Sequence, residues 1–121
     1  MNKPALALII ITLLIMFGGA FIFSRPVAIP ELVGYEYYWG DGCPHCKLVE
    51  EFYTKWENKD KINLKKFEVW NNTKNAEIMQ ERAKKCSIDR NQLGVPLLVT
   101  PDGKCLIGDE PIINHYKSLK F

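Results

Sequence analysis

Two cysteines three positions apart, in the tetrapeptide Cys-Pro-His-Cys over residues 43–46, constrain the fold of this chain more than any other feature. An aromatic, strand-forming run over 35–39 precedes them and ends in Gly-Asp-Gly. The apolar side chains that follow recur on one face of a predicted helix: Leu48, Val49, Phe52, Tyr53 and Trp56. A Cys-x-x-Cys pair between such a strand and such a helix is typical of thiol redox proteins, because the two sulfur atoms then lie close enough to form a disulfide.

Cys43 is predicted to lie at the N-terminus of this helix, where unpaired backbone N–H groups and the helix dipole stabilise an anion. We therefore expect its thiolate to form at lower pH than that of an ordinary cysteine, whose pKa is about 8.5. Cys46 lies one turn into the helix and is the expected resolving thiol. Pro44 suits the first turn, where its missing N–H costs nothing. His45 adds positive charge, which stabilises the thiolate and makes the disulfide a stronger oxidant.

Other chemistries of the cysteine pair are a structural disulfide, half of a zinc site, haem attachment and a soft-metal site. Zinc fits poorly, because Cys86 and Cys105 are single, widely separated cysteines and form no second Cys-x-x-Cys. Haem attachment needs a histidine directly after the second cysteine, where this chain has Lys47. A non-catalytic module in which Cys43 and Cys46 hold Cu(I) stays open as an alternative.

Strands and helices alternate in the prediction for the rest of the chain. Periodic apolar residues and turn-forming residues indicate a strand over 62–70, a helix over 76–86, strands over 97–99 and 105–107 joined by a turn at 101–103, and a last helix with apolar residues over 112–119. Asp109 is predicted to cap that last helix. The order β-α-β-α-β-β-α indicates an α/β fold whose first two strands are parallel.

Residues 4–23 form an uncharged, apolar run in which Thr12 is the only polar side chain. A helix of that length spans about 30 Å, the thickness of the hydrocarbon core of a bilayer. We therefore predict a transmembrane helix, or signal anchor, after a short tail over 1–3. The alternative is a cleaved signal peptide with Gly18-Gly19-Ala20 as its cleavage site.

The charged residues are distributed so that the predicted globular part is neutral. Lys3 and Arg25 are the only charged side chains before Glu31, and from there on 14 basic and 14 acidic residues balance. A neutral domain without a basic stripe argues against nucleic acid as a partner. Because Lys3 and Arg25 nearly balance, they code the orientation in a membrane only weakly. The expected thiol chemistry places the C-terminal part on the periplasmic or extracellular side, after a proline-containing linker over 24–33.

A Gly-Val-Pro sequence over residues 94–96 comes directly before the predicted strand over 97–99. From the residues alone, a trans proline that begins the strand is the simpler prediction. The alternative is a cis Val95-Pro96 bond that faces Cys43 and leaves the backbone of Val95 free to pair with an extended substrate.

The chain resembles the thioredoxin superfamily, and within it the short glutaredoxin-like branch, over residues 34–121. The residues that carry the resemblance are Tyr-Trp-Gly-Asp-Gly-Cys-Pro-His-Cys over 38–46, Gly-Val-Pro over 94–96, Asp-Gly-Lys over 102–104 and Ile-Gly-Asp over 107–109. The resemblance implies a three-layer α/β sandwich, a nucleophilic Cys43, a resolving Cys46 and a cis Pro96. The tetrapeptide itself is similar to that of the periplasmic disulfide-introducing Dsb oxidases, whose large helical insertion this chain lacks.

Two positions depart from the pattern of this family. Thioredoxins carry a buried acid six residues before the first cysteine, where this chain has Tyr37, with Glu36 beside it. Proton transfer from Cys46 therefore lacks a carboxylate assistant, or uses Glu36 with its side chain turned inward. Glutaredoxins that bind glutathione usually carry a basic residue shortly before the first cysteine. Asp41 stands in that stretch and would repel a glutathione carboxylate, so we expect no glutathione use.

Cys86 closes the apolar face of the second predicted helix, and Cys105 lies in the last predicted strand. The sequence leaves three interpretations open: two small buried apolar residues, a structural disulfide, or a second redox pair that relays electrons. A disulfide would close a loop of about 20 residues and add about 3 kcal/mol in the chain-entropy model. Such a bond suits a small exported domain.

These observations predict a membrane-tethered thiol–disulfide oxidoreductase that faces an oxidising compartment, needs no metal or organic cofactor, and acts on protein thiols or disulfides. A mixed disulfide would form at Cys43, and Cys46 would resolve it. Val95, Pro96 and Trp39 are the expected substrate-binding residues, and an unidentified redox partner would recycle the pair. The alternative within the same fold is a reductant for exported proteins or for cytochrome maturation.

Overall fold

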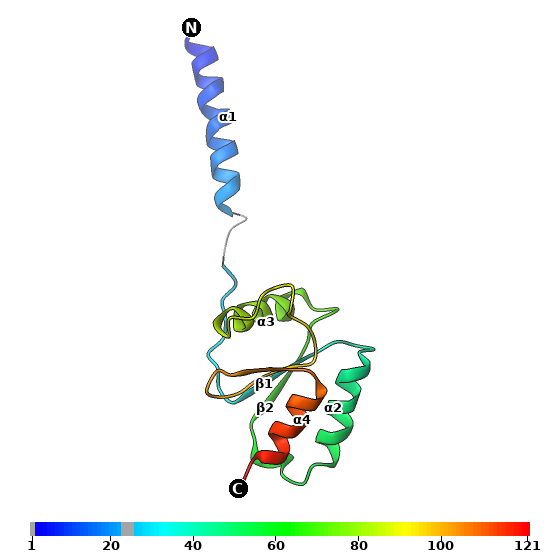
Figure 1. The fold of residues 1–121 in the computed structure, drawn as a ribbon. Coiled ribbons are helices and arrows are strands. Elements are labelled where there is room, and N and C mark those ends of the chain that lie inside the picture. The colour runs from blue at the N-terminus through cyan, green and yellow to red at the C-terminus, as the bar shows by residue number, and fades with distance from the viewer. Residues whose placement is uncertain (1, 23–25) are drawn as a thin grey trace.

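The structure of the protein is a computed structural model that describes residues 2–22 and 26–121, and of residues 18–22 the backbone alone. The helices and strands, shown in Figure 1, follow one another as α1 (Lys3–Ile22), β1 (Tyr35–Trp39), α2 (Pro44–Lys55), the 3-10 turn η1 (Lys59–Lys61), β2 (Leu64–Glu68), α3 (Thr73–Lys85), β3 (Leu97–Val99), β4 (Cys105–Ile107) and α4 (Asp109–Ser118). From β1 onward, the predicted order β-α-β-α-β-β-α is confirmed.

The four strands form one mixed sheet in the order β2-β1-β3-β4. Strands β1 and β2 are parallel, with Tyr35 opposite Leu64, which confirms the prediction for a strand pair joined through a helix. Strand β3 runs antiparallel to both β1 and β4. Figure 1 shows α3 on one face of the sheet and α2 with α4 on the other, so the domain has three layers.

Each face of the sheet has its own apolar cluster, because successive strand residues point to opposite faces. On the α3 side, Tyr38 packs with Leu97 and Val99. On the side of α2 and α4, Tyr37 packs with Leu98, and Val49, Ile112 and Tyr116 complete that cluster. Tyr37 and Tyr38 are 2% and 0% exposed, so β1 anchors both layers just before the cysteine pair.

Helix α1 covers Lys3–Ile22. A helix that crosses a membrane needs about 20 predominantly apolar residues, and within residues 2–22 and 26–121 no helix is both long enough and apolar enough to do so. Within these residues, the prediction of a transmembrane helix over 4–23 is therefore not confirmed. Four residues of the predicted N-terminal segments lie outside the described residues. They are Met1 of the predicted tail, Phe23 of the predicted transmembrane helix, and residues 24–25 of the predicted linker.

Part of the predicted linker packs against the domain. Val27, Ile29 and Leu32 lie on the apolar cluster of the α3 side. The guanidinium of Arg82, on α3, donates a hydrogen bond of 2.7 Å to the carbonyl of Pro30. The segment before β1 therefore covers one edge of that layer.

Three element boundaries differ from the sequence prediction for local reasons. Strand β2 ends at Glu68, two residues early, because the Glu68 carboxylate accepts the N–H groups of Trp70 and Asn71 and turns the chain. The apolar spacing predicted a helix that ends near Asn58, but α2 ends at Lys55, because Trp56 adopts extended backbone angles. Helix α4 is preceded by Gly108, at φ 97°, with no side-chain cap, so the expected cap by Asp109 is wrong. The Asp109 carboxylate contacts His45 of α2 instead.

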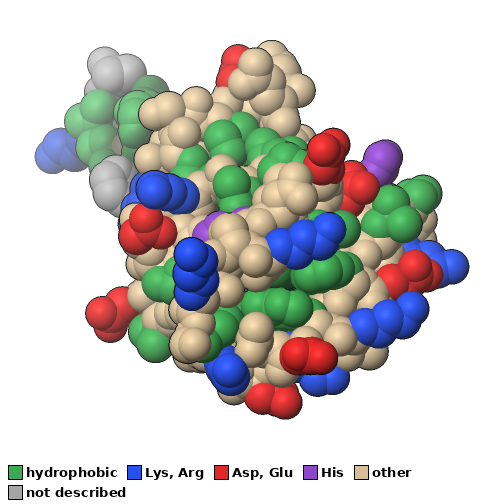
Figure 2. Space-filling model, turned by 60° about the horizontal axis from the view of Figure 1, so that its bottom comes forward, with side chains coloured by type: hydrophobic (Ala, Val, Ile, Leu, Met, Phe, Trp, Pro, Cys, Tyr) green, Lys and Arg blue, Asp and Glu red, His purple; other side chains and the backbone are tan. Residues whose placement is uncertain are grey.

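Acidic and basic side chains are interspersed on the face of the molecule that Figure 2 shows, with hydrophobic side chains between them. Several charged side chains of the domain form exposed pairs, such as Lys47 with Glu51 and Lys104 with Asp102. Exposed pairs of this kind contribute only about 0–1 kcal/mol to stability.

Candidate active site

Cys43 is the N-cap residue of α2, and its sulfur takes the place of the usual capping oxygen. The backbone N–H of Cys46 donates to the Cys43 Sγ at 3.1 Å, and Pro44 occupies the first helical turn, where no N–H is needed. Cys43 and Cys46 form a disulfide with their Cα atoms 5.2 Å apart. The helix start therefore directs a backbone donor at the sulfur that was predicted to be the nucleophile.

Both cysteines are largely enclosed, with 7% of Cys43 and 4% of Cys46 exposed. In the disulfide form the two cysteines therefore differ little in exposure. Pro44 and His45 beside them are exposed. Both cysteines also border a cavity.

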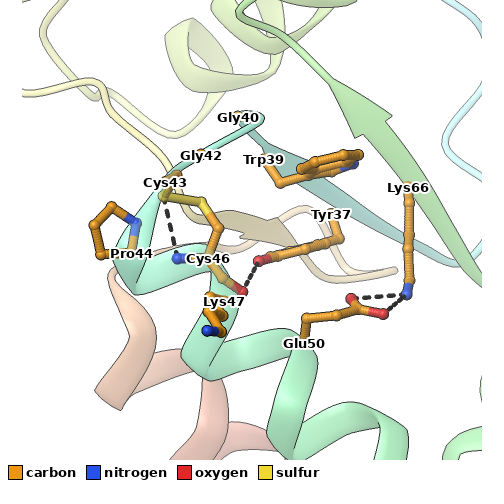
Figure 3. A pocket seen from close by; sticks show the side chains of 10 residues that line it. All are labelled: Tyr37, Trp39, Gly40, Gly42, Cys43, Pro44, Cys46, Lys47, Glu50 and Lys66. Carbon is orange, nitrogen blue, oxygen red and sulfur yellow. Dashed lines mark hydrogen bonds and ion pairs between the residues drawn. A yellow bond between two sulfur atoms is a disulfide. The ribbon is translucent and has the colours of Figure 1, made fainter.

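That cavity has a volume of about 620 Å³ and lies between β1, β2 and α2 (Figure 3). Its lining residues are Tyr37, Trp39, Gly40, Gly42, Cys43, Pro44, Cys46, Lys47, Glu50 and Lys66. Four of them, Trp39, Pro44 and the two cysteines, were predicted as site residues. Val95 and Pro96, the other predicted substrate-binding residues, do not line it.

Tyr37, Glu50 and Lys66 were missed by the sequence analysis. Glu50 follows Cys46 by four residues, so the helical period places it on the same side of α2, and this signal was available. Lys66 reaches the cavity because β2 pairs with β1 in the register that sets it opposite Tyr37. A strand register of this kind cannot be predicted from a single sequence.

The polar groups of the cavity wall bind one another. The Tyr37 hydroxyl donates to the backbone carbonyl of Cys46 at 3.3 Å. Burial raises the pKa of Tyr37 far above its ordinary value, and the charge of Glu50 adds to the effect, so the phenol stays protonated. Lys66 Nζ lies 2.6 and 2.8 Å from the two carboxylate oxygens of Glu50.

Glu36 does not assist Cys46. Strand alternation turns its side chain to the α3 face of the sheet, away from α2. There Arg82 donates two hydrogen bonds to it, of 2.7 and 2.9 Å, and the Tyr38 hydroxyl donates a third of 2.7 Å. Burial opposes ionisation of Glu36, but these hydrogen bonds and the charges of Arg82 and Lys65 outweigh it, so its pKa lies below the ordinary value. The suggested role of Glu36 in proton transfer is therefore wrong.

The peptide bond between Val95 and Pro96 is cis, as the family resemblance implied and as the residues alone did not favour. Pro96 is fully buried, and its carbonyl accepts the N–H of Gly108 at 3.0 Å. These two residues lead into β3, which lies next to β1 in the sheet.

The loop that carries Cys43 is attached to the end of β2. The Glu68 carboxylate accepts the N–H of Asp41 at 3.2 Å as well as those of Trp70 and Asn71 at 2.9 Å each. Solvation loss opposes the charge of Glu68, but these backbone hydrogen bonds outweigh it and lower its pKa. The indole of Trp70 lies directly against Gly40, so this position has no room for a side chain.

Cys86 and Cys105 form the second disulfide, one of the three possibilities that the sequence left open. Cys86 is the residue after α3, and Cys105 begins β4, with their Cα atoms 6.0 Å apart. Neither residue lines the cavity at Cys43. This disulfide joins α3 to the sheet edge that lies farthest from β2.

Among the described side chains, no group of three or more His, Cys, Asp or Glu residues is placed to hold a metal ion. In comparisons with known proteins, the chain matches no protein-family model, no curated protein and no solved structure. The molecule is a small α/β domain with a mixed four-stranded sheet and a Cys-x-x-Cys disulfide at the start of α2. This arrangement is consistent with a thioredoxin-like fold.

Proposed function

We propose that the chain is a thioredoxin-like thiol–disulfide oxidoreductase that acts on protein thiols and disulfides through Cys43 and Cys46. The observation that carries this proposal is the Cys43–Cys46 disulfide at the N-terminus of α2, bordering a cavity of about 620 Å³. A purely structural disulfide does not need an adjacent cavity or a helix N-terminus.

In the oxidising direction, a substrate thiolate attacks the Sγ of Cys43. A new disulfide joins the substrate to Cys43, the Cys43–Cys46 bond breaks, and Cys46 leaves as a thiolate that takes up a proton. A second substrate thiolate then attacks the substrate sulfur of this mixed disulfide and releases Cys43. The substrate loses two electrons, and the cysteine pair gains them.

Cys43 suits the role of the leaving thiolate in that last step. The N–H of Cys46, 3.1 Å from its sulfur, and the positive end of the α2 dipole stabilise negative charge there. His45, the residue after Pro44, adds positive charge when protonated. Stabilising the reduced thiolate form favours an oxidase or isomerase over a reductase, and a separate redox partner must recycle the pair.

We also propose that this domain works in an oxidising compartment, on the periplasmic or extracellular side. Two disulfides in one small domain support this, because thiols of reducing compartments are kept reduced.

Disulfide exchange is tested with the reduced and the oxidised protein. We expect the oxidised protein to oxidise a dithiol peptide, and the reduced protein to reduce insulin. Cys43→Ser should abolish both reactions. Cys46→Ser should accumulate mixed disulfides between Cys43 and substrates, whereas the double substitution of Cys86 and Cys105 by Ala should keep turnover.

The proposal is wrong if turnover survives Cys43→Ser, or if no substrate becomes attached to the Cys46→Ser variant. Metal analysis of the reduced protein runs beside these assays. Stoichiometric Cu(I) binding without any turnover would make the pair a metal site instead. The reduction potential of the pair then decides between oxidase and reductant.

A further inference from the structure

The cavity beside the disulfide offers apolar walls to whatever enters it. Its aromatic and apolar side chains are Tyr37, Trp39 and Pro44, and Gly40 and Gly42 contribute backbone without side chains. A Cβ atom added at Gly42 would meet nothing within 4 Å, so the space next to Cys43 is open. Figure 3 shows the disulfide at one end of this cavity and the Glu50–Lys66 pair at the other.

The polar atoms of the walls have little to give to a polar guest. The Tyr37 hydroxyl already donates to the carbonyl of Cys46, and Lys66 already neutralises Glu50. Lys47, the other charged residue of the lining, is 77% exposed and lies 3.9 Å from Glu51, so its charge is directed to solvent. A charged or strongly polar guest would lose its hydration here without gaining an unpaired partner, which costs free energy. An apolar side chain has no hydrogen bonds to water to lose, and its burial in the cavity is favourable in free energy.

The position of the sulfur atoms indicates which part of a substrate enters the cavity. Both cysteines line the cavity, so a polypeptide that is disulfide-bonded to Cys43 is attached at the edge of this cavity. Neighbouring residues of an extended chain are only about 3.3 Å apart along the strand. The side chain next to the reactive cysteine is therefore the part of the substrate that reaches the cavity.

Resting on the proposed function, we propose that this cavity is a specificity subsite for an aromatic or large aliphatic side chain adjacent to the substrate cysteine. The preferred substrates are then polypeptides whose reactive cysteines have apolar neighbours. Trp39 and Tyr37 form the walls of the subsite, and the Glu50–Lys66 ion pair closes its far end.

Single-turnover reactions of the oxidised full chain with short thiol peptides test this subsite. The peptides are Ala-Phe-Cys-Ala and Ala-Cys-Phe-Ala, and each is compared with the peptide that has glycine in place of phenylalanine. The rate of each peptide is divided by its rate with 2-hydroxyethyl disulfide, which corrects for the reactivity of its own thiol. The peptide thiolate displaces Cys46 from Cys43, so no external oxidant is needed. We expect at least one phenylalanine peptide to react about tenfold faster than its glycine counterpart, the scale of discrimination that an apolar pocket provides.

Two pairs of matched variants localise the preference. Trp39→Leu should reduce the preference for phenylalanine to about threefold or less, whereas Trp56→Leu, at the far end of α2 and outside the cavity, should keep it. Lys66→Met leaves the Glu50 carboxylate unpaired in the cavity and should also reduce the preference. Lys65→Met changes the neighbouring residue of β2, which does not line the cavity, and should leave it unchanged. Because each value is a ratio of two peptides on one variant, effects on Cys43 itself cancel.

The outcomes separate this inference from the proposed function. If no peptide exchanges with the disulfide, the proposed function is wrong, and the subsite with it. Equal rates for phenylalanine and glycine peptides overturn the subsite alone. If the phenylalanine and glycine peptides react at equal rates, and these rates fall as the protein concentration rises, a second copy of the chain occupies the cavity. This result would also overturn the subsite.

Discussion

His45 Nδ1 lies 3.0 Å from Asp109 Oδ1, so the residue between the two redox cysteines contacts the first residue of α4. The His45 side chain is 69% exposed and that of Asp109 is 27% exposed. The contact joins the starts of α2 and α4, two helices that pack on the same face of the sheet. It also explains why Asp109 does not cap its own helix.

Replacing His45 by alanine should change the redox chemistry far more than the stability. Loss of the positive charge destabilises the Cys43 thiolate, so the reduction potential should fall by about 30 mV, equivalent to about 1.4 kcal/mol. The unfolding free energy should fall by less than about 1 kcal/mol, because the His45–Asp109 pair is exposed. Redox titration and urea unfolding measure the two effects. His115→Ala, which changes the histidine of α4 outside the cavity, serves as the control, and an equal potential shift there would contradict the role of His45.

Removing the Cys86–Cys105 disulfide should cost stability and leave the chemistry intact. The bond joins residues 19 apart in sequence, and a loop of this size corresponds to about 3 kcal/mol in the chain-entropy model. We expect the Cys86→Ala, Cys105→Ala variant to unfold at lower urea concentration with unchanged turnover per folded molecule. The matched Cys43→Ala, Cys46→Ala variant removes a bond that closes a much smaller loop. It should lose turnover and unfold at nearly the same urea concentration as the wild-type chain. Loss of turnover in the folded Cys86→Ala, Cys105→Ala variant would instead support an electron relay.

Local patterns in the sequence were sufficient to predict most of the fold from β1 onward. The aromatic run at β1, the helical spacing after Cys43 and the turn at residues 101–103 each depend on neighbouring residues only. The parallel pairing of β1 and β2 followed from the helix between them. The position of Cys43 at the start of α2 followed from the same local signals.

Contacts between distant residues were not predictable in this way. The approach of Lys66 to Glu50 depends on a strand register, and Asp109 meets His45 only because two helices pack together. Glu36 presented a choice between two faces of a strand, and its partner Arg82 lies 46 positions away. Such pairings are decided by tertiary packing, which cannot be predicted from the local patterns of one sequence.

Breaking the buried Glu36–Arg82 pair on one side should be strongly destabilising. The two side chains are 2% and 5% exposed, and Glu36→Gln leaves the Arg82 charge without its partner. Losing one member of a buried pair costs about 3–5 kcal/mol, which urea unfolding measures. Replacing both, as Glu36→Leu with Arg82→Met, should restore most of this loss, because no buried charge then remains. Glu81→Gln removes an exposed pair with Lys84 on the same helix and should cost little.

The same pair predicts how stability depends on pH. The pKa of Glu36 in the folded protein is below its ordinary value, because the hydrogen bonds and charge of Arg82 outweigh burial. Its contribution is therefore complete above the unfolded pKa of about 4.3 and is lost as the pH falls through the lower folded value. Unfolding curves between pH 7 and pH 2 should show a larger acid loss for the wild-type chain than for the double variant Glu36→Leu, Arg82→Met. Parallel curves for the two proteins would contradict this assignment, since Glu68 and Asp102 titrate in both.

The contact between Gly40 and Trp70 should be visible as a coupling between two substitutions. A methyl group at Gly40 would overlap the indole of Trp70, whereas the backbone of Gly40 is not left-handed and adds no strain of its own. Gly40→Ala should therefore cost about 1–3 kcal/mol, the usual range for overpacking. In the Trp70→Ala background the same change should cost much less. Gly94→Ala, where a methyl group meets open space, is the control. If Gly40→Ala costs the same in both backgrounds, the loop does not depend on this contact, and backbone contacts such as the Asp41 hydrogen bond to Glu68 hold it beside β2 instead.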